Sequence, residues 1–398
     1  MKAEKQETGL KLTNVQLQKV ITSHLMEEKG LNDLFSMLVN GLMYSERQAF
    51  LSQEGIDGNK GNGYRQATRS GIGAKLQLSI PRDRLGVFKP VILGLLDQQD
   101  DQIKELCFEL YGKGMTTRQI EGIIGRIYGT HYSKSSISRI TTDFSALVES
   151  WLSRPLENYY PVVYIDAIHI KVRRDTVSTE AFYVLLGLKK DFTREVLGIV
   201  NIPQESASGW REVLCDIRDR GVEHVGLFVS DDLKGLDKVI GEVFSSSKHQ
   251  RCILHFQRNL YKNIRKSDRV AFSEEVKSVF NPDDPTYSQQ QAIINLRQVI
   301  GKWAVKYPKL IKSIEGKAPD DLFTYLAYDR RVRRMLYTTN WIERLNKSFR
   351  RTLKMRNALP HPSAAITLLG FVAMEMEEGT YSYPINNFKF EEKLCIIE

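Results

Sequence analysis

The order of strands and helices predicted between residues 160 and 254 constrains the fold of this chain more than any other feature. Apolar, β-branched runs predict five strands, at residues 162–165, 182–188, 196–202, 225–229 and 252–254. Between the last three strands, two segments repeat their apolar residues at helical spacing, which are Trp210, Val213, Leu214 and Ile217, then Leu236, Val239, Ile240 and Val243.

Three strands followed by a helix, a strand, a helix and a strand is the element order of an RNase H-like sheet. The residues that follow this sheet are polar and helical in pattern, which predicts an insertion. We therefore expect an α+β multidomain fold with an RNase H-like catalytic core at residues 155–258 and 336–380. An all-helical insertion at 259–335 interrupts that core, and a C-terminal tail occupies 381–398.

Acidic residues follow two of the predicted strands. Asp166 comes directly after the apolar run Val162–Ile165, and Asp231 comes directly after Val225–Ser230. Taken alone, Asp166 fits a strand-end turn and Asp231 fits a helix N-cap. If the two strands are neighbours, however, their ends meet, and Glu343 from a later helix can complete the group. Three carboxylates held close together repel one another unless a divalent cation lies between them. Two Mg²⁺ ions about 4 Å apart suit cleavage of a phosphodiester.

Glu343 begins a predicted helix whose other charged residues are basic. Residues 330–356 contain ten Lys or Arg and one acid. At 3.6 residues per turn, one face of this helix carries Glu343, Lys347, Arg350, Arg351 and Lys354. Another face is apolar and suited to burial, with Ile342, Leu345, Phe349 and Leu353. The simpler alternative makes Asn340 the N-cap and Glu343 part of a capping box, which is compatible with a catalytic role.

A net charge of +9 makes a polyanion a plausible partner for the chain. The region 1–110 is expected to bind DNA and to support dimerisation. Its residues 13–53 predict two amphipathic helices suited to core packing or self-association, with stripes at Leu17, Val20, Ile21 and Leu25, then Leu34, Phe35, Leu38, Val39 and Leu42. Glycines at 55–74 predict a flexible basic loop, followed by a short strand that stops at Pro81. Four arginines in this stretch are candidate DNA contacts, namely Arg65, Arg69, Arg82 and Arg84.

The region 111–150 has the pattern of a helix-turn-helix. Thr116 or Thr117 caps the first helix, Gly129 breaks it, and Ser133 caps the second. Isoleucines are predicted to point inward, at Ile120, Ile123, Ile124, Ile127, Ile137 and Ile140. Short polar and basic side chains of the second helix point outward and suit a major groove, namely Lys134, Ser135, Ser138, Arg139 and Thr142. A plain helical hairpin is the alternative. Lys171 and Arg173, beyond Asp166, are further candidate DNA contacts.

The four cysteines are far apart in a long chain, which favours a reducing bacterial cytoplasm over a disulfide framework. No apolar run is long enough to predict a signal peptide or a membrane span. Cys252 and His255 resemble half of a zinc site, but the second ligand pair that structural zinc requires is missing. We expect these two residues and Asp232 at the rim of the acidic cluster.

Four motifs in this order resemble the signatures of Mutator-type bacterial insertion-sequence transposases. They span residues 166–173, 230–236, 250–259 and 338–346, and the segments 62–65 and 80–84 are similar to the N-terminal region of that family. The resemblance covers about 60 to 370. It implies a DDE triad of Asp166, Asp231 and Glu343 that binds two Mg²⁺, for which Mn²⁺ would substitute. The family usually has a small or neutral residue after the second acid, so Asp232 leaves a second choice of ligand open.

The resemblance also implies a homodimer that binds double-stranded DNA, both the terminal inverted repeats of its element and a target, within the bacterial nucleoid. Movement would proceed by 3′-end cleavage and strand transfer, through a copied circular intermediate. Two alternatives are a junction resolvase of the same fold and a domesticated DNA-binding protein without activity. The predicted helix-turn-helix argues against the first, because a resolvase needs little sequence reading, and the acids argue against the second.

Overall fold

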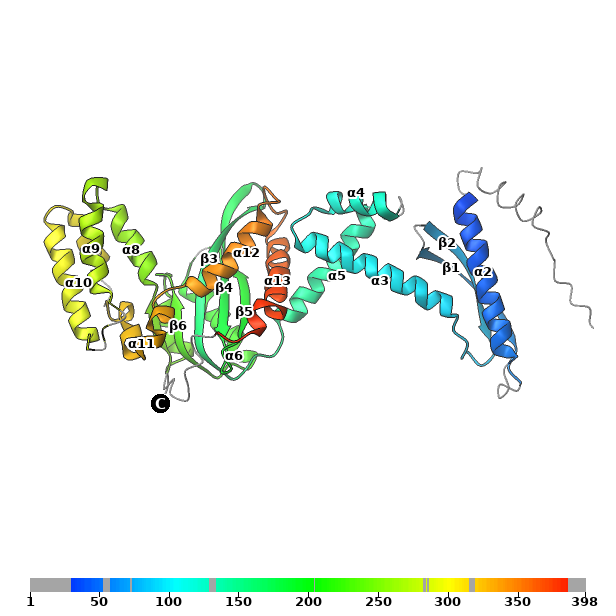
Figure 1. Ribbon diagram of the computed structural model, residues 1–398, viewed down its shortest axis with the longest axis horizontal. Helices are drawn as coiled ribbons and strands as arrows, with labels where there is room; N and C mark the ends of the chain where they lie inside the picture. Colours follow the sequence, from blue (N-terminus) through cyan, green and yellow to red (C-terminus); the bar gives the residue numbers. More distant parts are fainter. Residues whose placement is uncertain are drawn as a thin grey trace, which may run out of the picture. The chain divides into compact units, whose positions relative to one another are not determined.

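The computed structural model describes residues 30–52, 58–71, 74–128, 134–203, 205–281, 284, 286–314 and 319–385 (Figure 1). They belong to two compact units. The first lies within Met1–Tyr111 and Met115–Thr142, and the second within Gly112–Gly114 and Asp143–Glu398. Among the described residues, no helix combines the length and the apolar character needed to cross a bilayer.

The first unit is built around a two-stranded antiparallel hairpin. Its elements are α2 (Gly30–Leu51), β1 (Gly61–Gly71), β2 (Ala74–Asp83), α3 (Val91–Gly112), α4 (Thr117–Tyr128) and the start of α5 (Lys134–Leu152). A small core joins α2, β2 and α3 through apolar side chains, namely Val39, Met43, Leu76, Leu78, Ile80 and Leu96.

Two expectations for this unit were wrong. The predicted flexible loop contains β1, which carries a single apolar side chain toward the core, Ala67, and is held by main-chain pairing with β2. The second strand continues through Pro81 to Asp83, whose carboxylate accepts the N–H groups of Val87 and Phe88. Within the predicted stripe on α2, Val39 is buried, whereas Leu38 and Leu42 are 54% and 53% exposed, so core packing accounts for only part of the stripe. The stripe at Leu17–Leu25 lies outside the described residues.

The two helices predicted at 113–148 are present as α4 and α5. Thr116 and Gln119 form a reciprocal capping box at the start of α4. The inward isoleucines are buried at Ile120, Ile124, Ile137 and Ile140. Ile127 was wrongly placed, since it is 61% exposed in the last turn of α4. The predicted break at Gly129 and cap at Ser133 lie outside the described residues.

A five-stranded mixed sheet forms the centre of the second unit (Figure 1). Its strands are β3 (Tyr159–Arg173), β4 (Val177–Leu188), β5 (Arg194–Asn201), β6 (His224–Ser230) and β7 (Lys248–Arg251), in the spatial order β5-β4-β3-β6-β7. The first three pair antiparallel, while β6 is parallel to β3 and β7 is parallel to β6. The unit is therefore a mixed α/β structure.

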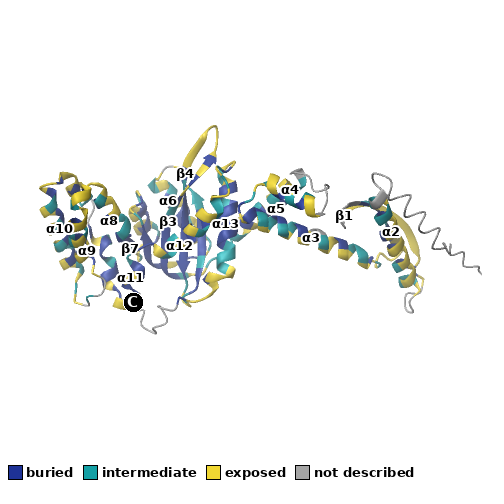
Figure 2. Ribbon diagram, turned by 45° about the horizontal axis from the view of Figure 1, so that its top comes forward, coloured by how far each residue is buried: buried dark blue, intermediate teal, exposed yellow. Residues whose placement is uncertain are grey.

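Helices cover both faces of this sheet. On one face lie α6 (Ala207–Asp219) and α7 (Leu236–Val243), whose apolar stripes form one core with the strands around Trp210. On the other lie α12 (Asn340–Leu353) and α13 (Pro362–Glu378), which contact β3 and β5. Figure 2 shows the strands largely buried, except for the tip of the β3–β4 hairpin at residues 173–179.

The fifth strand is Lys248–Arg251 and not 252–254 as predicted. Its sequence, Lys-His-Gln-Arg, has no apolar alternation. The strand is therefore recognised by its main-chain pairing with β6 and not by a side-chain pattern. Cys252 is the N-cap of the next helix, α8 (Ile253–Lys262).

The segment after α8 is helical, as its pattern indicated. It contains η1 (Lys266–Asp268), α9 (Arg269–Val279), α10 (Gln289–Ala304), η2 (Pro308–Ser313), η3 (Pro319–Leu322), η4 (Thr324–Ala327) and α11 (Arg330–Leu336). Aromatic rings form its interior. Phe272 lies 5.3 Å from Trp303, and Phe280 stacks on Phe323 at 5.1 Å between ring centroids.

Candidate active site

The register between β3 and β6 places two carboxylates side by side. The last pair in this ladder is Ile165 with Ser230, so Asp166 and Asp231 each come one residue beyond it. Asp231 follows the end of β6 as predicted. Asp166 does not end its strand, because β3 continues to Arg173 and pairs there with Leu359. The alternative of a strand-end turn for Asp166 is therefore wrong.

Asp166 is buried, with 4% of its surface exposed. Its Oδ1 accepts the Ala167 N–H at 2.9 Å, and its Oδ2 accepts Asn346 Nδ2 at 2.7 Å. Burial, followed by the nearby charge of Asp231, raises the pKa of the Asp166 carboxyl to about 6. A buried carboxylate that faces a second carboxylate is a high-energy arrangement, and a cation would relieve it.

Asp231 is held by a histidine from α8. His255 Nδ1 lies 2.5 Å from Asp231 Oδ1, and the same nitrogen lies 3.3 Å from Cys252 Sγ. Contact with Asp231, and then with Cys252, raises the pKa of His255 to about 10. Cys252 is buried, and Thr339 Oγ1 lies 3.4 Å from its sulfur. Asp231 does not cap α7, whose N-cap is Gly235.

Helix α12 brings Glu343 and Asn346 to the cluster, since the two residues lie one turn apart on it. The helix starts at Asn340 with Thr339 as its N-cap and has no side-chain capping bond. The predicted cap at Asn340 is thus wrong by one residue, and Glu343 takes no part in a capping box. Instead Glu343 Oε1 lies 3.7 Å from Arg258 Nη1.

Arg258 links the histidine that holds Asp231 to Glu343 on α12. Its Nη1 lies 3.2 Å from His255 Nε2, while the same nitrogen faces Glu343. A continuous polar path therefore runs from Asp231 through His255 and Arg258 to Glu343. This path spans the end of β6, helix α8 and helix α12.

Asp232 lies apart from this path. Its side chain is half exposed, and its Oδ1 lies 4.0 Å from Arg251 Nη1. Arg251 in turn forms a 2.6 Å ion pair with Asp321. Asp231 contacts His255 and influences the pKa of Asp166, so the geometry favours Asp231 over Asp232 as the second acid.

The donor set at this position suits a divalent cation. Asp166, Asp231 and Glu343 offer the carboxylate oxygens that Mg²⁺ and Mn²⁺ prefer. Asn346 Oδ1 is buried and has no hydrogen-bond partner among the described residues, which suits a site that also holds water or an ion. Among the described residues, the ligand atoms that lie within 4.8 Å of one another are those of Asp231, Cys252 and His255, whereas Asp166, Asp231 and Glu343 do not form such a group in this structure.

Two residues of this cluster were missed in the sequence. Asn346 lies three positions after Glu343, and Arg258 lies three positions after His255. Helical spacing from a residue already singled out was the available signal in both cases.

The predicted DNA-contacting side chains are exposed wherever the structure describes them. These are Arg65, Arg69, Arg82 and Arg84 near the hairpin, Ser138 and Arg139 on α5, Lys171 and Arg173 on β3, and Lys347, Arg350, Arg351 and Lys354 along α12. Lys134 begins α5, but its side chain lies outside the described residues. On the opposite face of α12, Ile342, Leu345 and Phe349 are fully buried as predicted, whereas Leu353 is half-buried. Contact with DNA stays a prediction for all of them.

Comparison with known proteins identifies relatives over most of the chain. The family model for transposases of the Mutator family matches residues 5–382. The transposase for insertion sequence element IS905 of Lactococcus lactis is 33% identical, covering 86% of this chain and 89% of that protein. The transposase for IS1201 of Lactobacillus helveticus is 31% identical, covering 90% and 99%. The transposase for IS256 in transposon Tn4001 of Staphylococcus aureus is 28% identical, covering 93% and 96%.

Proposed function

Because the chain belongs to the Mutator family of transposases, we propose that it mobilises an insertion sequence by binding the terminal inverted repeats and cutting the DNA at their 3′ ends. The register that sets Asp166 beside Asp231, within reach of α12, carries this proposal. The strand order β5-β4-β3-β6-β7, antiparallel and then parallel, supports an RNase H-like catalytic core. Asp166, Asp231 and Glu343 act as the DDE triad of that core.

In the first step a water attacks the scissile phosphorus, and the P–O3′ bond breaks to leave a 3′-hydroxyl on one side and a 5′-phosphate on the other. In the second step that 3′-hydroxyl attacks a phosphorus of the target strand, so that a new P–O3′ bond forms while the target's own P–O3′ bond breaks and leaves a 3′-hydroxyl on the target. Two Mg²⁺ ions, when bound, supply the charge that activates the attacking oxygen and stabilises the leaving oxygen.

The surrounding side chains hold the three acids in place. Asn346 donates to Asp166 and fixes the direction of its Oδ2. His255 does the same for Asp231, and Arg258 forms a longer ion pair with Glu343. Hydrogen-bonding partners of this kind orient ligands and tune the affinity of a site. Cys252 and Thr339 position His255 through the start of α8.

Sequence-specific binding belongs to the first unit in this proposal. Buried Ile120, Ile124, Ile137 and Ile140 leave the outer face of α5 free for a major groove, as in a helix-turn-helix. Met37, Leu38 and Leu42 form an exposed apolar patch on α2, and this patch favours a homodimer on paired ends.

Single substitutions in the triad test the catalytic assignment. We expect Asp166→Asn, Asp231→Asn and Glu343→Gln each to abolish Mg²⁺-dependent nicking at the boundary of the element while end binding stays nearly intact. Asp232→Asn is the matched control and should cut normally. Normal cutting by Asp231→Asn together with loss in Asp232→Asn would reverse the choice of second acid. Normal cutting by all four variants would refute the DDE assignment.

A further inference from the structure

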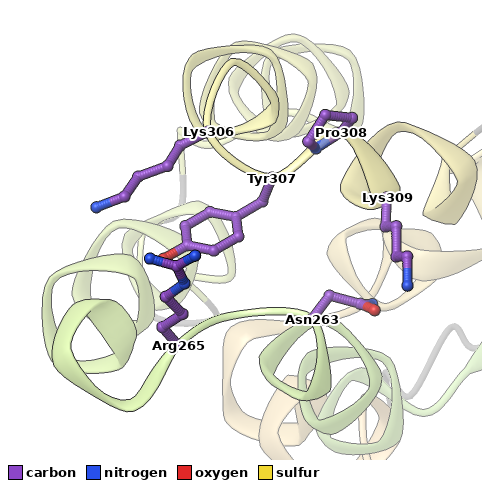
Figure 3. A pocket seen from close by; sticks show the side chains of 6 residues that line it. All are labelled: Asn263, Arg265, Lys306, Tyr307, Pro308 and Lys309. Carbon is purple, nitrogen blue, oxygen red and sulfur yellow. The ribbon is translucent and has the colours of Figure 1, made fainter.

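A basic pocket lies in the helical segment beyond the candidate active site. It has a volume of about 370 Å³ and is lined by Asn263, Arg265, Lys306, Tyr307, Pro308 and Lys309. In Figure 3, Tyr307, Pro308, Lys309 and Asn263 lie around the opening, Arg265 lies beside the Tyr307 ring, and Lys306 points away from the opening. The pocket joins the loop after α8 to the start of η2.

The charges in this segment are strongly one-sided. Residues 262–269 and 302–312, which meet at the pocket, carry eight Lys or Arg and one acid, Asp268. That acid is already used, because it pairs with Lys306 at 2.5 Å and also accepts the Tyr307 hydroxyl. Among the described residues, neither Arg265 nor Lys309 has an ion-pair partner. Arg265 and Lys309 both line this pocket. Like charges in one pocket repel each other, and a bound anion would relieve that repulsion.

Helix α8 connects the pocket to the acidic cluster. Arg258 contacts Glu343, and Lys262 follows one turn later on the same face. Asn263, at the pocket, is the C-cap of α8. The five residue steps from Arg258 to Asn263 advance about 7.5 Å along a helix axis. That length corresponds to about two nucleotides along one strand of B-DNA, at 3.4 Å per nucleotide.

We propose that Arg265 and Lys309 together hold one backbone phosphate of the DNA, a few nucleotides from the scissile phosphate. The position of this phosphate relative to the scissile phosphate rests on the proposed function, whereas the binding of an anion in the pocket does not. A second grip on the strand would restrict its rotation and keep the scissile bond aligned with the acids. Phosphate contacts of this kind fix register and carry no sequence information directly.

The salt dependence of DNA binding tests the proposal in the full chain. The test variant is Arg265→Ala/Lys309→Ala. The matched control is Lys277→Ala/Arg297→Ala, which removes two exposed cations of α9 and α10 outside the pocket lining. Binding to duplex containing the element end is measured without Mg²⁺ at several salt concentrations. Loss of one phosphate contact should lower the slope of log affinity against log salt by about 0.9 in the test variant. A slope equal to that of the control would overturn the proposal.

Neutral methylphosphonate links then locate the phosphate. Each phosphate near the cleavage site is replaced in turn, first in the element-end duplex and then in a target duplex. We expect one position where the replacement weakens binding by wild type and by the control but not by Arg265→Ala/Lys309→Ala. A position beyond the element end assigns the pocket to flanking DNA, and a position in the second duplex assigns it to target DNA. Equal sensitivity of all three proteins at every position would refute the pocket.

The two proposals fail separately in this design. Binding is measured without metal, so the slope reports the pocket even if the wild-type protein does not cut. A wild type that cuts the element end while the slope stays unchanged in the test variant would refute the pocket alone.

Discussion

Replacing Asp166 with Asn should stabilise the folded protein in the absence of metal. The folded-state pKa of Asp166 is about 6, against an ordinary value of 3.8. A shift of about two pKa units corresponds to about 3 kcal/mol at neutral pH, at 1.36 kcal/mol per unit. The amide of Asn removes this charge penalty but offers one acceptor oxygen where Asp166 accepts both Ala167 N–H and Asn346 Nδ2. Losing one of these hydrogen bonds costs about 1 kcal/mol, which leaves a net gain of about 2 kcal/mol.

The pH dependence gives the expected sign. A carboxyl with a raised folded-state pKa binds more protons in the native state than in the unfolded state between pH 3.8 and about 6. Wild-type stability from this group therefore falls as pH rises through that window and stays low above it. Asp166→Asn lacks this dependence. The advantage of the variant should be largest at pH 7.5 and should shrink as pH falls from 6 to 4.

The free energy of unfolding of both proteins is measured by urea unfolding, which is followed by tryptophan fluorescence in a buffer that contains a chelator. All four tryptophans, Trp151, Trp210, Trp303 and Trp341, lie in the second unit, so the signal reports the unit that contains Asp166. Asp232→Asn is the control and should change stability by less than about 0.5 kcal/mol, because its side chain is half exposed.

Added Mg²⁺ should reverse the ranking of the two proteins. At about a hundred times its dissociation constant, an ion that binds only the folded state stabilises it by about 2.7 kcal/mol. This gain should occur in wild type and be lost in Asp166→Asn. A variant that is less stable than wild type at pH 7.5 in chelator, or an advantage that does not vary with pH, would refute the reasoning.

Three further substitutions test other parts of the chain. Phe349→Ala should lower the free energy of unfolding by about 3–5 kcal/mol in the same urea assay, because the Phe349 side chain is fully buried on the inner face of α12. A loss below about 1 kcal/mol would contradict that packing. Arg350→Ala/Arg351→Ala should lower the salt slope of DNA binding by up to about 2, and an unchanged slope in a folded variant would leave both as surface charge. Arg139→Ala should reduce discrimination between element ends and scrambled duplex by about 1–3 kcal/mol in competition binding. Unchanged discrimination would show that Arg139 does not read a base.

The sequence alone was sufficient for elements whose side-chain pattern repeats clearly. The strands β4 to β6, the first half of β3 and the helices α6, α7 and α12 carry dense apolar periodicity, so burial of one face predicted them, although β3 continues past the predicted strand to Arg173. It was insufficient for β1 and β7. Their side chains lack apolar alternation, and main-chain pairing with a neighbouring strand holds each in place. Sequence also could not decide which apolar residues of α2 and α4 stay exposed, because that depends on which face meets another element.

For the candidate site, the sequence by itself singled out Asp166, Asp231 and Glu343 as acids next to predicted strands and at the start of a helix. Only the tertiary structure decided what surrounds them. The β3–β6 register places the two aspartates side by side, and the turn after β6 points Asp231 to His255 and Asp232 to Arg251. Contacts between residues far apart in the chain, such as Asn346 with Asp166, depend on how helices pack across a sheet. Side-chain periodicity records which face of an element is buried, but not which residue of another element it meets.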